Sequence, residues 1–444
     1  MRWNGSLLEI PVYYIQGQAC RDDKKRRFGV KRCIMNKINI IDVTNRDGVQ
    51  TAHLGLSKLQ KTMINYYLNQ MGVFQSEAGF PVTGHEINYL NANLKLARQK
   101  VLSPIRISGW MRAIPQDVEE AFKNIPELEH INISISTSEQ MIVGKFQGKM
   151  KIRDVINEMK DALMLARKKG ARSVGVNAED ASRTKTGRLI EFAMTAKEHG
   201  ADRVRYCDTL GCDSPFTIYD KIYKIAKEVK IPIELHCHND LGMVVAVSVA
   251  GAKAAVDAGV DAYINTTVNG MGERAGNADL VSVILALRYA AGFAGRYRLD
   301  PGIDLKMAWK ISHYASYAFG VPIPINQVGV GKNAFAHSSG IHVDGALKDR
   351  RNYELYDFEE LGRGVPEVVE SGRMILLGEY SGIKGLRNVY GKLEVKFKDD
   401  EEAREILTLA RYANVANQLP LTDEELIFIA KHPEEVRQLL TLTP

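Results

Sequence analysis

The chain has 444 residues, of which 45% are hydrophobic and 25% are charged, and its formal net charge is +6. A chain of this length predicts one large domain with a smaller appendage. The positive charge is small and spread along the sequence, so it does not indicate nucleic-acid binding, although a mild basic excess suits an anionic substrate. Five cysteines do not make a disulfide framework and favour a reducing compartment, for which we expect the cytoplasm.

Two segments bear on targeting and membrane association. The opening of the chain has no uninterrupted apolar run of the kind that a signal peptide needs. The Ala-rich run 243–260 is interrupted by Lys253 and Asp257, which favours a buried helix over a membrane span.

Residues 1–36 have no clear period and contain the charge run D-D-K-K-R-R. We interpret them as a solvated N-terminal arm, with a CoA-phosphate contact or a subunit contact as the alternatives.

From residue 38 the sequence alternates short β-branched runs with amphipathic helical stretches. Eight strands, each followed by a helix, over about 250 residues are typical of an α/β fold, the (β/α)8 TIM barrel, and we assign residues 37–300 to it. Catalytic residues of such barrels lie at the C-terminal ends of the strands. The predicted strands are 38–44, 73–80, 105–111, 130–136, 173–178, 203–208, 232–238 and 262–268; the predicted helices are 56–71, 86–100, 117–124, 152–169, 186–199, 216–227, 241–258 and 279–291.

Beyond residue 300 the alternation stops. A helix at 305–319 leads into a segment rich in glycine and histidine, and we assign residues 301–350 to a linker. Residues 351–444 are predicted to form a small, mainly helical C-terminal subdomain with helices at 401–413 and 423–439. Within it, the run 389–398 could form a strand instead.

The pair His236 and His238, in the run L-H-C-H-N, closes the seventh predicted strand. Residues i and i+2 of a strand project from the same face, so the two imidazoles converge on one point. Two neutral histidines suit Zn, Mn, Fe or Co, with oxygen ligands to complete the coordination. The alternative is a pair of structural histidines near a strand end.

The first strand runs into D-V-T-N-R-D-G-V-Q, which places Arg46 and Asp47 at its C-terminal end. In a closed barrel the first and seventh strands are separated only by the eighth, so a carboxylate from this loop can join the two imidazoles. We therefore predict a divalent metal site made by Asp47, His236 and His238. The forked guanidinium of Arg46 suits a substrate carboxylate or carbonyl, although an exposed Arg46–Asp47 ion pair is the alternative.

The fifth and sixth strands carry charged residues toward the same end. Asn177 and Glu179 share one face of the fifth strand, and Arg205 and Thr209 share one face of the sixth. An arginine aimed into a barrel is costly unless it is paired or meets an anion. Arg205 therefore either meets Glu179 or a similar acid, or it receives a second substrate carboxylate.

A glycine-rich loop, N-G-M-G-E-R-A-G-N, follows the eighth strand. Its glycines allow a tight turn that brings backbone N–H groups near an anion or a thioester. Asn277, at the end of the loop, could hold a metal-bound water or Glu273. The loop residues that we place near such a thioester are Asn269, Gly270, Gly272 and Glu273.

Five motifs in order, D-x-T-x-R-D-G-x-Q, S-E-A-G-F-P, C-D-T-L-G, H-C-H-N-D-L-G and N-G-M-G-E-R-A-G-N, resemble the family of acyl-CoA condensing metalloenzymes. That family contains 2-isopropylmalate, homocitrate, citramalate and Re-type citrate synthases. The resemblance covers roughly residues 38–345. It implies a metal-dependent TIM barrel that condenses acetyl-CoA with a 2-oxo acid and then hydrolyses the thioester.

Carried over to this chain, the resemblance assigns roles to individual residues. It implies a divalent ion (Mn, Mg, Zn or Co) on Asp47, His236 and His238, and it places Asn277 next to that site. It also implies Arg46 and Gln50 at the 2-oxo acid, Thr209 at its carboxylate and Glu179 in the acid/base machinery, where we place Arg46 as well. To the substrate-binding residues we add Asn177 and Arg205 from their places on the fifth and sixth strands.

The segment N-A-F-A-H-S-S-G-I-H-V-D-G looks like the linker that, in this family, reaches into the barrel of the neighbouring subunit. His342, with Tyr353 eleven residues later, would then supply the general acid/base in trans. His337 is interpreted as structural. A homodimer with shared active sites follows from this assignment, with acetyl-CoA and a small 2-oxo acid as the only other partners.

An inward Arg205 disfavours an apolar substrate pocket, because its charge would be unpaired there. We therefore favour a dicarboxylic 2-oxo acid, either oxaloacetate to give citrate or 2-oxoglutarate to give homocitrate, and expect Arg205→Ala to damage substrate use more than folding. The alternative is a 2-isopropylmalate or citramalate synthase with a monocarboxylic substrate. A 3-hydroxyacyl-CoA lyase of the same barrel type is disfavoured because residues 269–277 contain no cysteine.

Overall fold

The computed structural model describes residues 36–293, 297–364 and 376–441. The predicted N-terminal arm therefore lies outside the described residues, apart from Asn36. The contact to CoA phosphate or to a subunit that the sequence analysis considered for this arm stays a prediction.

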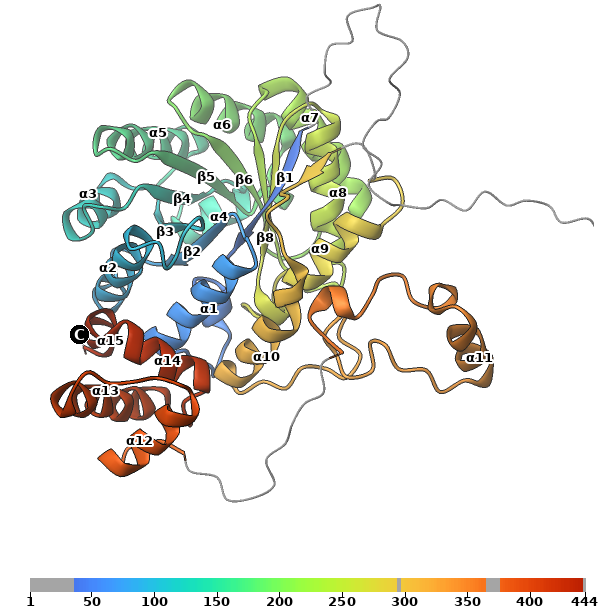
Figure 1. Cartoon of the computed structure of the whole chain (residues 1–444). Coiled ribbons are helices and arrows are strands. Elements are labelled where there is room, and N and C mark those ends of the chain that lie inside the picture. The colour runs from blue at the N-terminus through green and yellow to red at the C-terminus, as the bar shows by residue number, and fades with distance from the viewer. Residues whose placement is uncertain (1–35, 294–296, 365–375, 442–444) are drawn as a thin grey trace, which may run out of the picture. The chain divides into compact units, whose positions relative to one another are not determined.

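Eight parallel strands close into a barrel, as predicted (Figure 1). The sheet order is β2-β3-β4-β5-β6-β7-β8-β1, and β1 also pairs with β2, which closes the ring. A short ninth strand, β9 (Arg298–Leu299), adds to β1 and was not predicted. The barrel strands are β1 (Lys37–Asp42), β2 (Gln75–Gly79), β3 (Arg106–Arg112), β4 (His130–Ser136), β5 (Ser173–Glu179), β6 (Arg203–Asp208), β7 (Ile233–Cys237) and β8 (Ala262–Thr266).

Helices alternate with these strands and cover the outside of the barrel (Figure 1). Several begin at side-chain caps, such as Ser57 before α1 and Ser214 before α7, which satisfy N–H groups of the first turn. Helix α8 begins at Val244 rather than 241, because Gly242, with φ +73°, forms a turn before it. These helices are α1 (Lys58–Gln70), α2 (Gly84–Arg98), α3 (Pro115–Asn124), α5 (Ile152–Lys168), α6 (Thr186–Glu198), α7 (Pro215–Val229), α8 (Val244–Asp257) and α9 (Leu280–Tyr289).

Short helices lie in the loops at the C-terminal ends of the strands. Helix α4 (Glu139–Lys145), between β4 and α5, was not predicted from the sequence. Three 3₁₀ turns follow β1, β5 and β8: η1 (Gly48–Gln50), η2 (Ala181–Arg183) and η3 (Val268–Gly270). All four elements lie at the end of the barrel where the sequence analysis expects the catalytic residues.

The part of the chain after the barrel is helical in the described residues. The predicted strand at 389–398 is wrong: helix α12 buries Leu386, Val389 and Tyr390, a spacing that matches the turn of a helix rather than of a strand. The elements are η4 (Leu305–Met307), α10 (Ala308–Phe319), α11 (Gly340–Lys348), η5 (Arg350–Asn352), η6 (Glu359–Leu361), α12 (Ile383–Lys392), α13 (Asp400–Asn417), α14 (Asp423–Lys431) and α15 (Pro433–Leu440).

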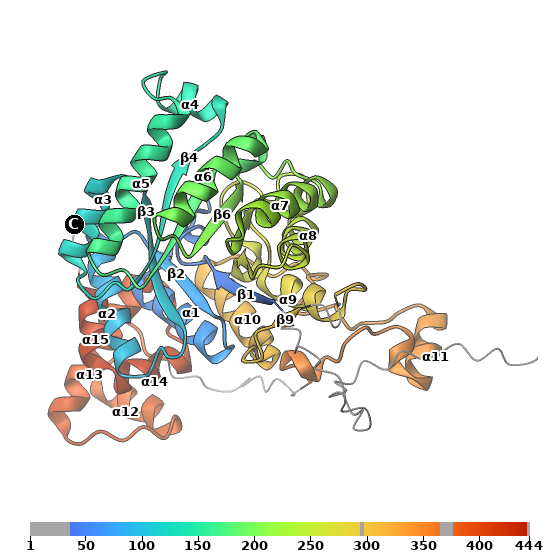
Figure 2. The same cartoon turned by 90° about the horizontal axis from the view of Figure 1, so that it is seen from above.

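Helices α13 and α15 pack beside α1 and α2, and α12 and α14 pack against α13 (Figure 2). Glu435 on α15 accepts hydrogen bonds from Gln99 at 2.9 Å and contacts Lys95 at 2.8 Å. Glu425 on α14 accepts from the hydroxyl of Tyr314 on α10 at 2.8 Å. Polar contacts therefore join the C-terminal helices to barrel elements far from them in sequence. The domain limits predicted from the sequence remain predictions.

Helix α11 differs from the other helices because it buries none of its residues. Its apolar side chains Ile341 and Leu347 are 76% and 82% exposed. None of the helices in the described ranges is long and apolar enough to cross a membrane.

Candidate metal centre and active site

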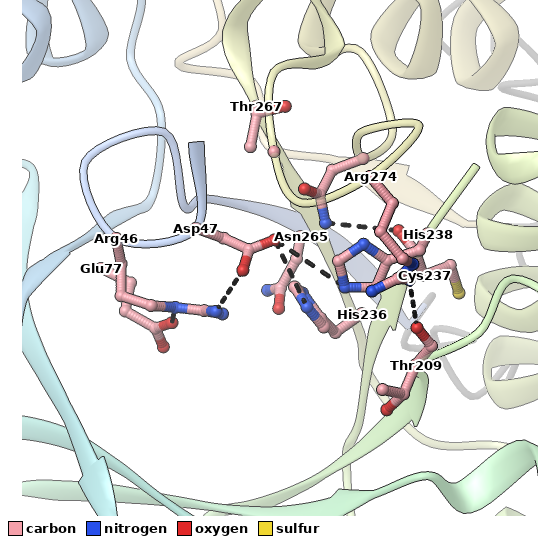
Figure 3. A network of polar contacts seen from close by, with 12 residues as sticks. Arg46, Asp47, Glu77, Thr209, His236, Cys237, His238, Asn265, Thr267 and Arg274 are labelled. Atoms are coloured by element: carbon pink, nitrogen blue, oxygen red, sulfur yellow. Dashed lines mark hydrogen bonds and ion pairs between the residues drawn. The ribbon is translucent and has the colours of Figure 1, made fainter. Parts of the chain in front are cut away.

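Asp47, His236 and His238 converge at the mouth of the barrel (Figure 3). Oδ2 of Asp47 lies 3.8 Å from Nε2 of each histidine, and the three ligand atoms all lie within 4.8 Å of one another. Two ligands that share one zinc-sized ion at a tetrahedral angle are about 3.4 Å apart. The three groups are therefore close to the spacing that coordination of a single cation needs.

The electrostatics of this trio suit a cation. Burial lowers the pKa of His236 well below its ordinary value, and burial also lowers the pKa of His238, so both rings are neutral, as metal ligands must be. Burial alone would raise the pKa of Asp47, but the adjacent charge of Arg46 is the largest of the effects that outweigh burial and hold this pKa below its ordinary value. Oδ2 of Asp47 is buried without a hydrogen-bond partner among the described residues. An ionised, unpartnered oxygen between two neutral imidazoles fits a divalent ion.

The loops after β1 and β8 hold Asp47 in place. The Asp42 carboxylate accepts from the backbone N–H of Thr44 at 2.9 Å, and the Thr44 hydroxyl accepts from the N–H of Val268 at 2.9 Å. Gly272, with φ +152°, lies so close to Asn277 that a Cβ there would be 1.8 Å from its Oδ1. Glycine at this position is therefore required for the loop to lie against the metal centre.

Asn277 lies beside the trio, as the resemblance implied. His238 and Asn277 form a β-bridge, and the Asn277 amide donates to the carbonyl of Cys237 at 3.4 Å. Its Oδ1 is buried and has no partner in the described part of the chain. This oxygen is available to accept a hydrogen bond from a ligand. The predicted role of Asn277 at a metal or a bound water is compatible with this position and stays a prediction.

Arg46 is not the solvent-exposed ion pair that the sequence left open. Its side chain is 7% exposed, donates from Nη1 to Asp47 at 2.8 Å and from Nε to Glu77 at 2.7 Å, and lies over the ring of Trp110. Two carboxylates therefore fix the guanidinium next to the metal trio (Figure 3).

Arg205 is fully buried below Arg46, and it pairs with acids, which was one of the two alternatives from the sequence, although the two acids are not the one named there. It donates to Glu234 at 2.8 Å and to Glu77 at 3.1 Å. Arg203 adds a second cation on Glu234 at 2.6 Å. The charges of Arg205 and Arg46 lower the pKa of Glu77 to about 2 against its burial. Arg205 does not meet Glu179, and the argument that its charge needs a substrate carboxylate loses its premise.

Asn177 and Glu179 lie two residues apart on β5, and both line the pocket at the barrel mouth. Asn177 is buried, and its amide oxygen, in the orientation that satisfies its neighbours, accepts from Trp110 at 3.0 Å and Arg205 at 3.2 Å. Glu179 is more exposed, and both of its carboxylate oxygens accept from Lys145 of α4, at 2.8 and 2.7 Å. The predicted acid/base residue is thus held by an ion pair from the neighbouring loop.

A pocket of about 200 Å³ joins most of the predicted site residues. Asn269, Gly270 and Asn277 instead line a larger groove of about 800 Å³ beside α8 and α9, so the glycine-rich loop faces two cavities. Lining residues of the smaller pocket that the sequence analysis named are Arg46, Asp47, Gln50, Asn177, Glu179, Arg205, Thr209, His236, His238 and Glu273.

His342 and Tyr353 do not line the pocket of their own chain. They stack on each other with ring centroids 4.2 Å apart, and His342 is exposed on α11. His337 lies 3.3 Å from Glu354. The stacked pair is pre-arranged, and its predicted action on a neighbouring subunit stays a prediction.

Sequence reasoning missed four side chains of this site. Glu77 stood in the quoted motif S-E-A-G-F-P without a role, and Glu234 stands two residues before His236, on the same face of β7. That period-two spacing was a usable signal for an inward acid. Trp110 and Lys145 carried no comparable signal, since an aromatic residue in a strand and a lysine in a loop are both common.

Comparison with known proteins identifies the family to which the chain belongs. Residues 37–314 match the HMGL-like family model, and residues 330–417 match the model described as homocitrate synthase post-HMGL domain-like. The chain belongs to the HMGL-like family. Its barrel and the segment that follows match the models of this family of enzymes, and the resemblance found in the sequence is confirmed.

Curated members of the HMGL-like family cover almost the whole chain. The citrate (Re)-synthase of Dehalococcoides mccartyi is 60% identical over 92% of this chain and 99% of its own length. The 2-isopropylmalate synthase 2 of Caldanaerobacter subterraneus is 40% identical over 88% of this chain and 94% of its own, and homocitrate synthase 1 of Nostoc sp. is 33% identical over 89% and 98%. The HMG-CoA lyase structure from Bacillus subtilis, at 16% identity and a TM-score of 0.53 over 65% of this chain and 96% of its own, shares the fold.

Proposed function

We propose that this protein is a Re-type citrate synthase, which condenses acetyl-CoA with oxaloacetate and hydrolyses the CoA thioester. The metal-dependent condensation rests on one observation, the convergence of Asp47, His236 and His238 at the barrel mouth with Arg46 fixed beside them. The choice of oxaloacetate rests on the 60% identity to a citrate (Re)-synthase over almost the full length of both chains.

A divalent cation on the trio would act as a Lewis acid that polarises the ketone of the 2-oxo acid. Two imidazole donors favour Mn, Co or Zn over Mg, although the family resemblance allows all four. Arg46 stabilises the negative charge that develops on the ketone oxygen as the new carbon–carbon bond forms. Because Asp47 and Glu77 already hold the guanidinium, it needs little reorganisation during the reaction.

The 2-oxo acid would lie in the pocket between Arg46 and the β5 and β6 strand ends. Gln50 and Thr209 line this pocket and carry side chains that can donate to a substrate carboxylate. Asn177 and Arg205 form its floor, and because their hydrogen bonds go to each other and to Glu77 and Glu234, they shape the pocket without supplying a free charge.

Proton transfer needs a base near the acetyl methyl group. Glu179 is at the pocket wall, and His342 supplies the base from a partner subunit, supported by Tyr353 stacked on it. The exposed apolar residues of α11, Ile341 and Leu347, favour docking of this helix against another chain. We therefore propose a homodimer in which each barrel receives α11 of the other subunit.

A complementation experiment tests the shared site. Subunits that carry Asp47→Ala and subunits that carry His342→Ala should each be inactive as homodimers, since each lacks one half of the site. Mixing them after reversible dissociation should restore up to about a quarter to a half of wild-type activity. An inactive mixture that contains heterodimers would contradict action in trans.

A substrate panel tests the reaction itself. Thiol release from acetyl-CoA should be rapid with oxaloacetate and slow with 2-oxoglutarate, pyruvate and 2-oxoisovalerate. Homocitrate formation would instead give its highest kcat/KM with 2-oxoglutarate, and a 2-isopropylmalate synthase with 2-oxoisovalerate. Citrate made from carbon-labelled acetyl-CoA and cleaved by a Si-specific citrate lyase should carry the label into oxaloacetate, and label in acetate would contradict Re-type addition.

We place the enzyme in the cytoplasm. Cys207, Cys212 and Cys237, the cysteines in the described residues, are all free thiols, which favours a reducing compartment.

A further inference from the structure

Trp110 is a large side chain in the pocket at the barrel mouth, and the reaction outlined above gives it no role. It lies on β3, is half-buried, and lines the pocket of about 200 Å³. On the neighbouring strand β4 it pairs in register with Asn132, whose fully buried amide donates to Glu77 of the floor at 2.6 Å. The indole therefore stands where the pocket meets the ion-paired floor.

Three contacts fix the indole in place. Its Nε1 donates to the amide oxygen of Asn177 at 3.0 Å, and the guanidinium carbon of Arg46 lies 5.5 Å from the ring centroid. Phe80 meets the ring edge to face, with the two centroids 5.5 Å apart. Because β4 separates β3 from β5, the bond to Asn177 holds the indole across β4. A ring held on three sides cannot move aside for a larger ligand without losing these contacts.

The pocket can measure the length of a ligand only at its inner end. The barrel is closed and its floor is filled by the paired Glu77, Glu234 and Arg205, so the second substrate has to enter from the mouth. In the proposed reaction the metal trio and Arg46 hold the ketone end of the 2-oxo acid, and its other end points inward. Trp110 is the largest of the lining side chains, so its removal opens the most space there.

A free hydroxyl lies beside the indole. Ser134, on β4, lines the same pocket and pairs in register with Asn177 on β5. Its Oγ has no hydrogen-bond partner in the part of the chain that the structure describes, unlike Asn177 and Arg205, whose hydrogen bonds are made within the floor. A hydroxyl in this state can donate to a carboxylate.

We propose that Trp110 sets the length of the 2-oxo acid by closing the inner end of the pocket, and that Ser134 donates to the distal carboxylate of an acid of the right length. This proposal deepens the proposed function and rests on it, since it assumes that a 2-oxo acid binds at the metal trio. Exclusion of one methylene group by a pocket wall gives a discrimination of about 10- to 200-fold, which is the range expected between oxaloacetate and 2-oxoglutarate.

A chain-length series tests the role of Trp110. Thiol release from acetyl-CoA is measured with oxaloacetate, 2-oxoglutarate and 2-oxoadipate for the wild type, Trp110→Phe and Trp110→Leu. The kcat/KM of each longer acid relative to oxaloacetate should rise about tenfold or more in Trp110→Leu and by less in Trp110→Phe. The ratio does not depend on the folded fraction of the sample, and the phenylalanine variant carries the test if the leucine variant is insoluble.

The matched control is Trp309→Leu, the same substitution on α10, where the side chain does not line the pocket. It should leave the ratios unchanged, even where it lowers stability. Ratios that stay at the wild-type value in the Trp110 variants, or that shift equally in Trp309→Leu, would overturn the role of Trp110.

Binding of acids with and without a distal carboxylate tests Ser134. In calorimetric titrations of the Mn²⁺-loaded protein, Ser134→Ala should raise the Kd for oxaloacetate about tenfold, as expected for the loss of one hydrogen bond to a charged group. The Kd for pyruvate, which has no distal carboxylate, should not change. An equal loss of affinity for both acids, or no loss for either, would contradict the role of Ser134.

The same measurements separate this proposal from the proposed function. A wild-type protein that prefers 2-oxoglutarate would contradict the assignment as a citrate synthase, yet Trp110→Leu should still shift its preference toward 2-oxoadipate. If the protein releases no thiol with any of these acids, the Kd values of the three acids replace kcat/KM in the comparison. A shift of the Kd ratio in Trp110→Leu would then support the role of Trp110, and an unchanged ratio would overturn it.

Discussion

The mouth and the floor of the barrel both contain buried polar side chains, but the two regions differ in how many of these polar atoms have a bonding partner. At the mouth, Oδ2 of Asp47 and Oδ1 of Asn277 are buried and have no partner in the described chain. At the floor, Glu77, Glu234 and Arg205 are equally buried, but each is bonded to at least one opposite charge. Oxygen atoms without a hydrogen-bond partner at the mouth show where a ligand is expected, whereas the ion pairs one layer below show side chains that already satisfy each other.

This difference changes the interpretation of charged residues in the barrel. Arg46 belongs to both layers, because it bonds to Asp47 above and to Glu77 below. The floor therefore orients the residue that acts at the mouth, and the alternating charges of the floor cancel. A buried cation inside a barrel does not by itself indicate an anionic substrate.

The largest effect is expected at the mouth. Asp47→Ala and His236→Ala should abolish stoichiometric metal binding and lower kcat by about 10³-fold or more, since a Lewis acid contributes several kcal/mol to the barrier. Metal content by mass spectrometry and thiol release from acetyl-CoA are the measurements. The exposed His85→Ala is the control and should retain both. Full metal occupancy in Asp47→Ala would overturn the site assignment.

Arg205→Ala should act on the floor, and mainly on stability. It leaves Glu77 and Glu234 buried without their shared partner, which costs about 3–5 kcal/mol of unfolding free energy. This reverses the expectation from sequence that substrate use would suffer more than folding. Urea denaturation measures the loss, with Arg98→Ala, an exposed partner of Glu127, expected to cost less than about 1 kcal/mol. A stable variant with only a raised KM for oxaloacetate would restore the substrate role.

The ion-paired Glu77 at the floor should also make the free energy of unfolding depend on pH in the acid range. The pKa of Glu77 is lowered from 4.5 to about 2, so its contribution is complete above pH 4.5 and is lost as the pH falls from 4.5 toward 2. The shift corresponds to about 3 kcal/mol. Urea denaturation at pH 7, 5, 4 and 3 should show the decline, and the same series on Glu77→Gln should show a shallower one. If the free energy of unfolding falls equally with pH in the wild type and in Glu77→Gln, carboxylates other than Glu77 cause the acid sensitivity.

A smaller effect is expected at the rim of the mouth. Lys145→Met removes the ion pair on Glu179, whose carboxylate then loses its fixed orientation, and kcat should fall about tenfold. In a Glu179→Gln background the same change should have little further effect, because the lysine acts through the carboxylate. Lys145→Arg should recover part of the loss, and the nearby exposed Lys149→Met should be neutral. Independent effects of the two substitutions would argue against coupling.

The sequence by itself determined the barrel and most of the mouth. Alternating β-branched strands and amphipathic helices fix the (β/α)8 order, and the period of two along a strand places His236 and His238 on one side. Adding Asp47 needed only the closure of the ring, which puts β1 and β7 two strands apart.

Only the tertiary structure decided which charged side chains form ion pairs with each other. Glu234 reaches Arg205 from the neighbouring strand β7, whereas Glu77 reaches it across the ring from β2, and a linear sequence carries no record of how far side chains reach across a barrel. The same holds for Lys145 on the unpredicted helix α4 and for the strand expected at 389–398, where packing against neighbouring helices outweighed local preference. Local periodicity sets the direction of a side chain, whereas its partner depends on contacts between distant segments.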